Sequence, residues 1–335
     1  MGLRVAINGF GRIGRNILRA GFHQPGIEFV HINDLTSDEM LAYLLRHDSV
    51  HGAWGEVTAT PEGLLVNGHL IHTSAVASPK ELPWKAKEVD VVFECTGVFT
   101  NAESAGQHLE AGASKVIISA PGTDIDGTFV VGVNQDTYDP TRHHIVSNAS
   151  CTTNCLAPVA SVLHERFGIE QGFMTTVHAY TMDQNLLDAA HRKGKFRRSR
   201  AAAQNMVPTS TGAATAIGLV LPELAGRLHG MAVRVPTPNV SMIDLVVQTR
   251  SSTTVEQVNA ALEEASTGRL KGILEFSSEE LVSSDLVGNP HSSIVDSKLT
   301  QVADGHLVKI ITWYDNEWGF SNRMLDLARL IGEHA

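Results

Sequence analysis

The sequence predicts an α/β protein of two domains, a doubly wound parallel sheet domain followed by an α+β domain with a mostly antiparallel sheet. At 335 residues, 43% of them hydrophobic, the chain is long enough to bury two cores. Its first third alternates strand-like and helix-like segments, which is typical of parallel sheets with right-handed crossovers. From about residue 151 the strand patterns become longer and alternate more regularly, as in an antiparallel sheet with one covered face.

The predicted first domain comprises residues 1–150. A helix begins at a glycine-rich turn after the first strand and carries Ile17, Leu18 and Ala20 on its apolar side, and a second helix is expected over Ala102–Ala111. Four short apolar runs are predicted to be buried strands: Arg4–Asn8, Ile27–Ile32, Val89–Cys95 and Lys115–Ser119.

The predicted second domain comprises residues 151–315 and joins the first without a flexible linker. Helices are expected at Ala157–Phe167, Val255–Ala265 and, beyond this domain, Ser321–Ile331. The alternating segments predicted to be strands are Phe173–Ala179, Met231–Val235, Ser241–Thr249 and Leu307–Tyr314.

Composition excludes several classes of protein. A formal net charge of −10 argues against nucleic-acid binding as the main role, because such binding depends on a basic surface. No run approaches the length of a membrane-spanning helix, and the N-terminus has no signal-peptide pattern, so we expect a cytoplasmic protein. Three cysteines are too few for a disulfide framework. They also lack the partners of a zinc site, so no metal is expected. One of the cysteines is therefore a candidate reactive thiol.

A glycine motif predicts dinucleotide binding. Gly9, Gly11 and Gly14 follow a predicted strand and open a predicted helix, and Asp34 lies 20 residues after Gly14 at the end of the next strand. In a Rossmann-type domain the first glycine allows a tight turn, the second lets the backbone approach the pyrophosphate, and the third lets helix and strand pack closely. Asp34 would bind the ribose hydroxyls and repel a 2′-phosphate. The alternative, an ordinary glycine-rich turn beside a surface aspartate, does not explain this context.

A cysteine-containing segment is the candidate for covalent chemistry. Cys151 and Cys155 lie among small polar residues that open an apolar helix. The amino end of a helix stabilises a thiolate, and its free amides can hold an oxyanion. Spacing alone does not separate this reading from a helix-capping segment with two inert cysteines. His178 is a candidate base for the thiol, although fifteen other histidines compete and a histidine in an alternating strand is more often a packed core residue.

Three features suit bound anions. Arg234 lies in an apolar strand and needs a carboxylate or phosphate partner there. The turn Thr209–Gly212 precedes an apolar helix and is a second possible anion site. A cluster of six basic residues follows His191; by charge pattern alone, a solvated loop that pairs with acids elsewhere is the simpler interpretation. These residues are Arg192, Lys193, Lys195, Arg197, Arg198 and Arg200.

Six segments together resemble the glyceraldehyde-3-phosphate dehydrogenase family, and the resemblance extends over essentially the whole chain. They are Ile7–Arg15, residues 147–155, Val177–Thr181, Pro208–Ala213, Arg234–Pro238 and Trp313–Gly319.

The resemblance implies a role for each candidate residue. Cys151 would be the nucleophile and His178 its base, acting through a thiohemiacetal, hydride transfer to the nicotinamide and cleavage of the thioester by inorganic phosphate to 1,3-bisphosphoglycerate, in glycolysis or gluconeogenesis. Thr181 and Arg234 match the substrate-phosphate site, whereas Cys155 matches a cysteine that is not the nucleophile. The positions matching the attacking-phosphate site are Ser150, Thr152, Arg198, Thr211 and Gly212. Those matching the cofactor site are Gly9, Gly11, Arg12, Ile13, Gly14, Asp34, Ser119 and Asn316.

The resemblance also implies a homotetramer, in which the basic loop reaches a neighbouring subunit's cofactor and the C-terminal helix, 316–335, joins the first domain. Two departures from the family pattern leave details open. Ala189-Ala190 replaces a segment that carries proline in strictly NAD-dependent members, so NADP is possible as an alternative or additional cofactor. Lys193-Gly194-Lys195 lengthens the basic loop, so the choice among Arg197, Arg198 and Arg200 for the phosphate site stays open.

Three other roles are consistent with parts of the sequence. An erythrose-4-phosphate dehydrogenase is a close relative, but such proteins usually differ around the substrate loop and the Thr209–Gly212 turn. A non-catalytic binding or scaffold role would leave the Cys151–His178 pair without a purpose. A redox switch at Cys151 is compatible with enzymatic activity, because a low-pKa thiolate is readily oxidised.

Overall fold

The computed structural model describes residues 2–334, which divide into two compact units. The first unit contains the chain up to Ser150 together with the segment from Ser321 onward, and the second runs from Cys151 to Phe320. The chain therefore leaves the first unit between Ser150 and Cys151 and returns to it within helix α7 (Trp318–Gly332).

The first unit is built on a nine-stranded sheet in the order β3-β4-β5-β2-β1-β6-β7-β9-β8. Its central strand pairs are parallel, and the hairpins β3–β4 and β4–β5 add antiparallel pairing at one edge. The predicted, mostly parallel sheet is confirmed. Its strands are β1 (Leu3–Asn8), β2 (Ile27–Asn33), β3 (Val57–Thr60), β4 (Gly63–Val66), β5 (His69–Ser74), β6 (Val91–Glu94), β7 (Lys115–Ile118), β8 (Gly127–Thr128) and β9 (Ile145–Ser147).

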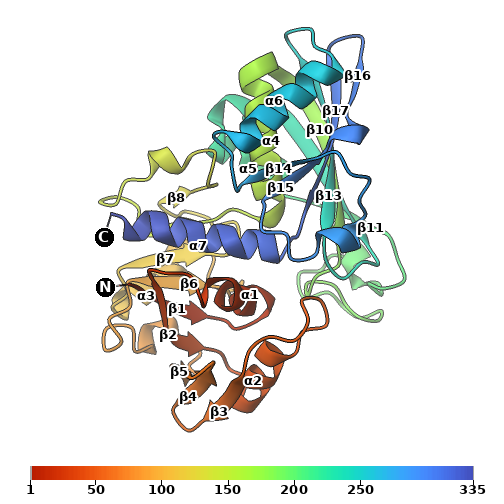
Figure 1. The fold of residues 1–335 in the computed structure, drawn as a ribbon. Coiled ribbons are helices and arrows are strands. Elements are labelled where there is room, and N and C mark those ends of the chain that lie inside the picture. The colour runs from red at the N-terminus through yellow and green to blue at the C-terminus, as the bar shows by residue number, and fades with distance from the viewer. Residues whose placement is uncertain (1, 335) are drawn as a thin grey trace. The chain divides into compact units, whose positions relative to one another are not determined.

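The strand order reverses beside β1. The chain passes from β1 to β2 on one side and later to β6 on the other side, so the carboxyl ends of β1 and β6 border a switch point. Open α/β sheets bind their ligands at such points. The helices of this unit are α1 (Arg12–Gly21), α2 (Asp38–Arg46) and α3 (Ala102–Glu110), the part of α7 from Ser321 onward, and the 3-10 turns η1 (Pro79–Glu81) and η2 (Gln135–Thr137) (Figure 1).

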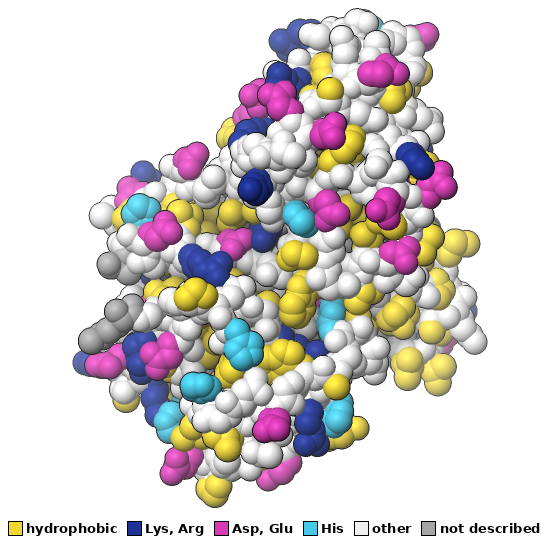
Figure 2. Space-filling view, in the orientation of Figure 1, with side chains coloured by type: hydrophobic (Ala, Val, Ile, Leu, Met, Phe, Trp, Pro, Cys, Tyr) yellow, Lys and Arg dark blue, Asp and Glu magenta, His cyan; other side chains and the backbone are white. Residues whose placement is uncertain are grey.

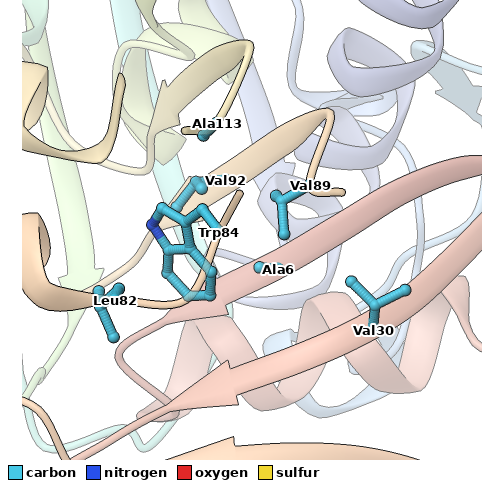
Figure 3. Packing of buried hydrophobic residues seen from close by; sticks show 7 residues of the cluster. All are labelled: Ala6, Val30, Leu82, Trp84, Val89, Val92 and Ala113. Carbon is cyan, nitrogen blue, oxygen red and sulfur yellow. The ribbon is translucent and has the colours of Figure 1, made fainter. Parts of the chain in front are cut away.

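Part of the first unit's core surrounds Trp84, which is fully buried (Figure 3). The apolar side chains of β1, β2 and β6 alternate so that one set faces this tryptophan. Burial of so large a ring contributes several kcal/mol at about 25 cal/mol per Å² of apolar surface. The members of the cluster are Ala6, Val30, Leu82, Trp84, Val89, Val92 and Ala113.

The second unit contains an eight-stranded sheet in the order β11-β12-β10-β13-β17-β15-β14, with β16 paired to β17. Most neighbouring strands are antiparallel, as predicted, but β10 pairs with β12 and β14 with β15 in parallel. Its strands are β10 (Ile169–Ala179), β11 (Val207–Ser210), β12 (Leu228–Val235), β13 (Ser241–Thr249), β14 (Leu274–Ser277), β15 (Ser293–Asp296), β16 (Gln301–Ala303) and β17 (Leu307–Tyr314).

The helices of the second unit differ from expectation at one important point. Helix α4 (Cys151–Phe167) begins six residues before the predicted start at Ala157, so Cys151 lies in its first turn. The predicted turn Thr209–Gly212 is also partly wrong, because Thr209 and Ser210 belong to β11. The other helices are α5 (Ala213–Val220), α6 (Val255–Thr267), and the 3-10 turns η3 (Arg197–Ser199), η4 (Pro222–Leu224), η5 (Ser283–Leu286) and η6 (Ser297–Leu299).

The surface carries charges of both signs. Acidic and basic side chains are interspersed over the face shown in Figure 2, in a chain whose formal net charge is −10. Among residues 2–334, no helix is long and apolar enough to cross a bilayer.

Candidate active site

The candidate nucleophile lies where a strained turn meets a helix. Cys151 is half-buried and is the first residue of α4. Two residues earlier, Ala149 has φ +56°, in the left-handed region that costs a residue with a Cβ about 1 kcal/mol or more. Ala149 is buried, and its amide donates a hydrogen bond of 2.9 Å to Oγ of Ser147. The first turn of α4 therefore presents the thiol beside backbone amides that have no partner within the helix.

His178 faces this thiol from the end of β10. Its Nε2 lies 3.6 Å from the Sγ of Cys151. Its Nδ1 lies 2.7 Å from the carbonyl oxygen of Ala179 and 2.8 Å from Nη1 of Arg234. Nδ1 cannot donate to the carbonyl and accept from the guanidinium at once. If Nδ1 carries the proton, Nε2 can accept one from the thiol; if Arg234 donates to Nδ1, Nε2 carries a proton and can donate to a thiolate. The surroundings of the ring suit either tautomer.

The electrostatics favour a neutral pair when the site is empty. Burial, followed by the charge of Arg234, lowers the pKa of His178 to about 3. Burial raises the pKa of the Cys151 thiol, and Arg234 acts in the opposite direction. Thiol and neutral imidazole are therefore the stable forms at neutral pH, and attack on a carbonyl requires the thiol proton to pass to the ring.

Arg234 is a half-buried cation without a carboxylate partner. The parallel pairing of β10 with β12 places it directly opposite His178. Its Nη1 donates to the carbonyl oxygen of Ala179 at 2.9 Å and approaches Oγ1 of Thr181 at 3.4 Å. Its Nε is buried without a hydrogen-bond partner, and no acidic side chain in residues 2–334 forms an ion pair with it. A desolvated guanidinium in this state favours an incoming anion.

The basic loop singles out Arg198. It is half-buried, whereas Arg197 and Arg200 are exposed. The guanidinium of Arg198 forms an ion pair with Asp183, and its Nε donates to Oγ1 of Thr209 at 3.0 Å. Unlike Arg234, Arg198 therefore has a carboxylate partner, as the simpler interpretation of the basic cluster expected.

The remaining predicted phosphate residues have different surroundings. Thr152 is buried, and its hydroxyl lies 2.9 Å from the hydroxyl of Tyr314. Thr211 is half-buried, and its Oγ1 accepts a hydrogen bond of 3.2 Å from the amide of Ala213 at the start of α5. Gly212 is exposed, and a Cβ there would meet no atom within 4 Å. Ser150, half-buried, directly precedes the nucleophile.

Tyr314 is a site residue that sequence reasoning missed. Its buried hydroxyl lies 2.9 Å from Oγ1 of Thr152 in α4 and 2.8 Å from Oγ1 of Thr176 in β10. Its ring packs edge-on against His178, with centroids 5.9 Å apart. Burial raises the pKa of Tyr314 well above its ordinary value, so the phenol stays protonated and donates to one threonine while accepting from the other. Two sequence signals point to it: its place at the end of an alternating strand and its position within Trp313–Gly319, a segment that carries the family resemblance.

Asn316 is oriented by a serine. The Oγ of Ser241 accepts a hydrogen bond of 3.0 Å from the amide of Ala179 and donates one of 2.8 Å to Oδ1 of Asn316. Because the side-chain oxygen is engaged, the amide nitrogen of Asn316 is the group left to bind a ligand.

The other two cysteines lack the features of a reactive thiol. Cys155 is fully buried between Ser293 and Thr312, and burial raises its pKa to about 12. Burial also raises the pKa of Cys95 far above its ordinary value. Within residues 2–334, no group of His, Cys, Asp and Glu side chains could hold a metal ion.

In the first unit, the three motif glycines have three different steric environments. Gly9 has φ +91°, and a Cβ there would lie 2.7 Å from the backbone nitrogen of Thr96. A Cβ on Gly14 would lie 2.3 Å from the carbonyl oxygen of Gly9, whereas one on Gly11 would meet nothing within 4 Å. Gly9 and Gly14 are thus required by the turn and its packing, and the space at Gly11 is open to a ligand.

The other predicted cofactor residues of this unit lie close to the same turn. Asp34 accepts hydrogen bonds from the amides of Phe10, at 2.7 Å, and Thr36, at 3.0 Å. Arg12 forms an ion pair with the buried carboxylate of Asp48. Asp34 therefore supports the glycine turn directly, while retaining acceptor sites on both oxygens.

Ile13 and Ser119 complete that set, and both are half-buried. Ile13 follows Arg12 in the first turn of α1. The amide of Ser119 donates to the carbonyl oxygen of Glu94 at 3.0 Å, which ties the residue after β7 to the end of β6.

Comparison with known families accounts for both units. Residues 3–102 match the family described as glyceraldehyde 3-phosphate dehydrogenase, NAD binding domain, and residues 150–316 match glyceraldehyde 3-phosphate dehydrogenase, C-terminal domain.

Similar curated proteins span nearly the full length of the chain. Glyceraldehyde-3-phosphate dehydrogenase 1 of Bacillus subtilis is 56% identical over 99% of this chain and 99% of its own. The glyceraldehyde-3-phosphate dehydrogenase of Geobacillus stearothermophilus is 57% identical over 99% and 98%, and that of Pseudomonas aeruginosa is 56% identical over 98% of each. With the glycine turn, the Cys151–His178 pair and this similarity along its length, the chain belongs to the glyceraldehyde-3-phosphate dehydrogenase family.

Proposed function

We propose that this protein is a phosphorylating, NAD(P)-dependent glyceraldehyde-3-phosphate dehydrogenase that converts glyceraldehyde 3-phosphate and inorganic phosphate into 1,3-bisphosphoglycerate. The observation that carries the proposal is the Cys151–His178 pair beside an arginine without a carboxylate partner. A thiol with an adjacent base suits covalent attack on an aldehyde, and the free cation suits a phosphorylated substrate.

The first step is formation of a thiohemiacetal on Cys151. His178 takes the thiol proton through Nε2, 3.6 Å away, as Sγ attacks the aldehyde carbon. Backbone amides at the start of α4 stabilise the resulting oxyanion. When the oxyanion collapses, NAD supplies the hydride acceptor, and Cys151 is left carrying a thioester.

The second step is cleavage of that thioester by phosphate. An oxygen of inorganic phosphate attacks the thioester carbonyl, the carbon–sulfur bond breaks, and the thiolate of Cys151 is regenerated. We assign Thr181 and Arg234 to the substrate phosphate, since Arg234 lacks a carboxylate partner. To the attacking phosphate we assign Ser150, Thr152, Arg198, Thr211 and Gly212. Because Arg198 is paired with Asp183, its engagement with phosphate requires that this pair loosen or share the anion.

For the cofactor, we assign residues 1–150 with the C-terminal segment 316–335 as the dinucleotide-binding domain, and residues 151–315 as the catalytic domain. The open space at Gly11 and the unused acceptor sites of Asp34 support binding of the pyrophosphate and the ribose. NAD fits this site better than NADP does, since the carboxylate of Asp34 repels a 2′-phosphate. The proposed cofactor residues are Gly9, Gly11, Arg12, Ile13, Gly14, Asp34, Ser119 and Asn316.

We further propose a cytoplasmic homotetramer. The loop between β10 and β11 exposes large apolar side chains, among them Met182, Leu186 and Phe196, with exposed fractions of 89, 80 and 91%. Such groups are costly to leave in water and are typical of surfaces that meet another chain. Sedimentation of the purified protein tests this assignment; a monomer would contradict it.

The activity is tested by following nicotinamide reduction with glyceraldehyde 3-phosphate and NAD, with and without phosphate, and then with NADP. We expect sustained turnover only when phosphate or arsenate is present. A single burst equal to the enzyme concentration and unaffected by phosphate would contradict the phosphate assignment. Turnover with erythrose 4-phosphate alone would favour that substrate, and no reduction with either aldehyde would favour a scaffold role.

A further inference from the structure

A buried polar cluster lies at the carboxyl ends of β1, β2 and β6, and the chemistry proposed above does not use it. We call it the Glu94 network; its members are Asn8, Asn33, Glu94, Thr96 and His108. Apart from Thr96, all are buried, and the side chains of Glu94 and His108 are completely so. Buried polar groups are costly unless every one is hydrogen-bonded.

The carboxylate of Glu94 accepts four hydrogen bonds. Its Oε2 receives one from Nδ2 of Asn8 at 2.6 Å and one from Nε2 of His108 at 3.0 Å. Its Oε1 receives one from the amide of Thr96 at 2.8 Å and one from the hydroxyl of the same threonine. These four hydrogen bonds fill all the acceptor sites of the carboxylate. Glu94 is therefore a buried carboxyl group that is fully hydrogen-bonded.

Trp84 determines the form of His108. The indole nitrogen of Trp84 lies 2.9 Å from Nδ1 of His108, and an indole N–H can only donate. Nδ1 must therefore be the acceptor, and the proton of the neutral ring lies on Nε2, directed at Glu94. In a protonated ring, Nδ1–H and the indole N–H would be two donors facing each other without an acceptor. In residues 2–334, no Lys or Arg forms an ion pair with Glu94, so neutral groups supply its hydrogen bonds.

The network connects the strands that carry the dinucleotide loops. Oδ1 of Asn8 accepts a hydrogen bond of 2.7 Å from Nδ2 of Asn33, which joins β1 to β2, and Asn8 donates to Glu94, which joins β1 to β6. The next residues after Asn8 and Asn33 are Gly9 and Asp34, both in the proposed cofactor site.

The two loops that border the switch point meet directly above this network. A Cβ on Gly9 would lie 2.7 Å from the backbone nitrogen of Thr96, the same nitrogen that donates to Glu94. The amide of Gly9 donates to the carbonyl oxygen of Asn33 at 2.8 Å. The position of the loop after β6 thus determines how the glycine turn lies, and Glu94 anchors both.

We propose that Glu94 is a positioning residue for dinucleotide binding: its carboxylate, held by Asn8, Thr96 and His108, fixes the spacing of the loops after β1 and β6. This inference rests on the proposed function for the identity of the ligand. Affinity for a pyrophosphate depends on amides that are already oriented, and hydrogen bonds to a buried charged acceptor hold a backbone more firmly than neutral ones.

Two substitutions and a matched control test the proposal. Glu94→Gln keeps the shape of the side chain but replaces one acceptor oxygen with an NH2 group, so in either orientation donors face a donor. Thr96→Val removes the hydroxyl, which donates to Glu94 and accepts a hydrogen bond of 3.1 Å from the amide of Val98, but keeps the backbone donor of residue 96. It is the milder change and is the deciding variant if Glu94→Gln fails to fold. Val92→Ala, two residues earlier in the same strand and buried in the cluster around Trp84, removes core packing but none of the hydrogen-bonding groups of the network.

The dissociation constant for NAD is measured by calorimetry on nucleotide-free protein, together with the free energy of unfolding and the alkylation rate of Cys151. We expect Glu94→Gln to weaken NAD binding about tenfold, because buried donors lose their acceptor. Thr96→Val should weaken it about threefold, because the carboxyl group of Glu94 loses one donor. Alkylation of Cys151 should not change. Val92→Ala should lose stability while binding NAD within about twofold of the parent protein.

NAD binding that is unchanged in Glu94→Gln and Thr96→Val would overturn the proposal. The proposal would also be overturned if Val92→Ala lost as much stability as the network variants and weakened NAD binding by the same factor. In that case the effect of the network on NAD binding would come only from its contribution to stability. Failure of the proposed function gives a different result, since the parent protein itself would then not bind NAD or not reduce it with glyceraldehyde 3-phosphate.

Discussion

Replacing Arg234 by glutamine is predicted to make the Cys151 thiol less acidic. The Nη1 of Arg234 lies 2.8 Å from one nitrogen of the His178 ring, and the other nitrogen lies 3.6 Å from Sγ of Cys151. Across the ring, the cation therefore lies within about 9 Å of the sulfur. At that distance and an effective dielectric constant of about 20, two unit charges interact by about 2 kcal/mol, a little more than one pKa unit.

The sign of the change follows from both ionisations. Arg234 lowers the pKa of Cys151, so its removal raises that pKa. Its removal also raises the pKa of His178, but burial, the larger cause of the low value there, remains. The imidazole therefore stays neutral at pH 7 and does not compensate for the lost charge. At a pH below the thiol's pKa, the thiolate fraction should fall by about tenfold for each unit of increase.

The assay is the rate of iodoacetamide alkylation of Cys151 in the substrate-free protein, measured from pH 7 to 12. The midpoint of the Arg234→Gln profile should lie about one unit above that of the parent protein. Arg227→Gln is the matched control, because Arg227 is also half-buried and also donates to a strand carbonyl, that of Ile169. It lies seven residues from Arg234, roughly 23 Å along the strand and beyond the screening length of about 8 Å. An unchanged or lower midpoint in Arg234→Gln, or an equal shift in Arg227→Gln, would refute this reasoning.

Further substitutions test other parts of the account. Tyr314→Phe leaves two threonine hydroxyls without their shared partner and should cost about 1–3 kcal/mol in the free energy of unfolding, measured with urea; an unchanged value would contradict the bridging role. Cys155→Ser should retain both activity and alkylation, because burial keeps that thiol protonated, whereas Cys151→Ser should lose both; the reverse pattern in a turnover assay would exchange their roles. Asp48 has a pKa lowered to about 2: although burial opposes the shift, hydrogen bonds from backbone amides and from Arg12 outweigh it. Because the folded-state pKa lies below the unfolded one, the ionised carboxylate stabilises the fold by about 1 kcal/mol after solvent screening is allowed for. This stabilisation is present above about pH 4 and is lost as the pH falls towards 2, so Asp48→Asn should destabilise the protein at pH 7 and progressively less below pH 4. A constant difference between denaturation curves would exclude this linkage.

The fold was predictable where the pattern is local and long. The strand β1 and the helix α1 follow from a short apolar run and a glycine turn, and β13 follows from strict alternation over nine residues. The hairpins β3–β5 and the helix α2 were not predicted. The strands of those hairpins are only four to six residues long and partly exposed, so their sequences carry little periodicity.

The start of α4 was predicted six residues too late because its first turn consists of Cys, Thr and Asn. These residues have low propensity within helices, but they are favoured where a helix begins, since their side chains can bind its free amides. The helix also contains Pro158, a residue that is more usual in the first turn of a helix than in its interior. An apolar pattern detects the buried face of a helix and not its polar first turn.

The candidate site was predictable from the residues only in part. The glycine turn with Asp34 is a local motif whose mechanism dictates its spacing. Cys151 and His178, by contrast, are 27 residues apart, and Tyr314 comes from the other end of the same unit. Their proximity depends on the pairing of β10 with β13 and of β13 with β17, which no spacing in the sequence reveals. For Cys151 and His178 the resemblance to a family supplied the hypothesis, whereas the place of Tyr314 in the site comes from the structure alone, which also supplies the mutual geometry of all three.

The most direct test of the central claim is to trap the acyl group on the enzyme. The protein is mixed with glyceraldehyde 3-phosphate and NAD without phosphate, quenched in acid, and the peptide containing Cys151 and Cys155 is sequenced by mass spectrometry. We expect a phosphoglyceroyl thioester on Cys151 and no adduct in Cys151→Ser. Inorganic phosphate should release the acyl group as an acyl phosphate much faster than water hydrolyses the thioester. An adduct on Cys155, no adduct at all, or discharge that is indifferent to phosphate would contradict the central claim.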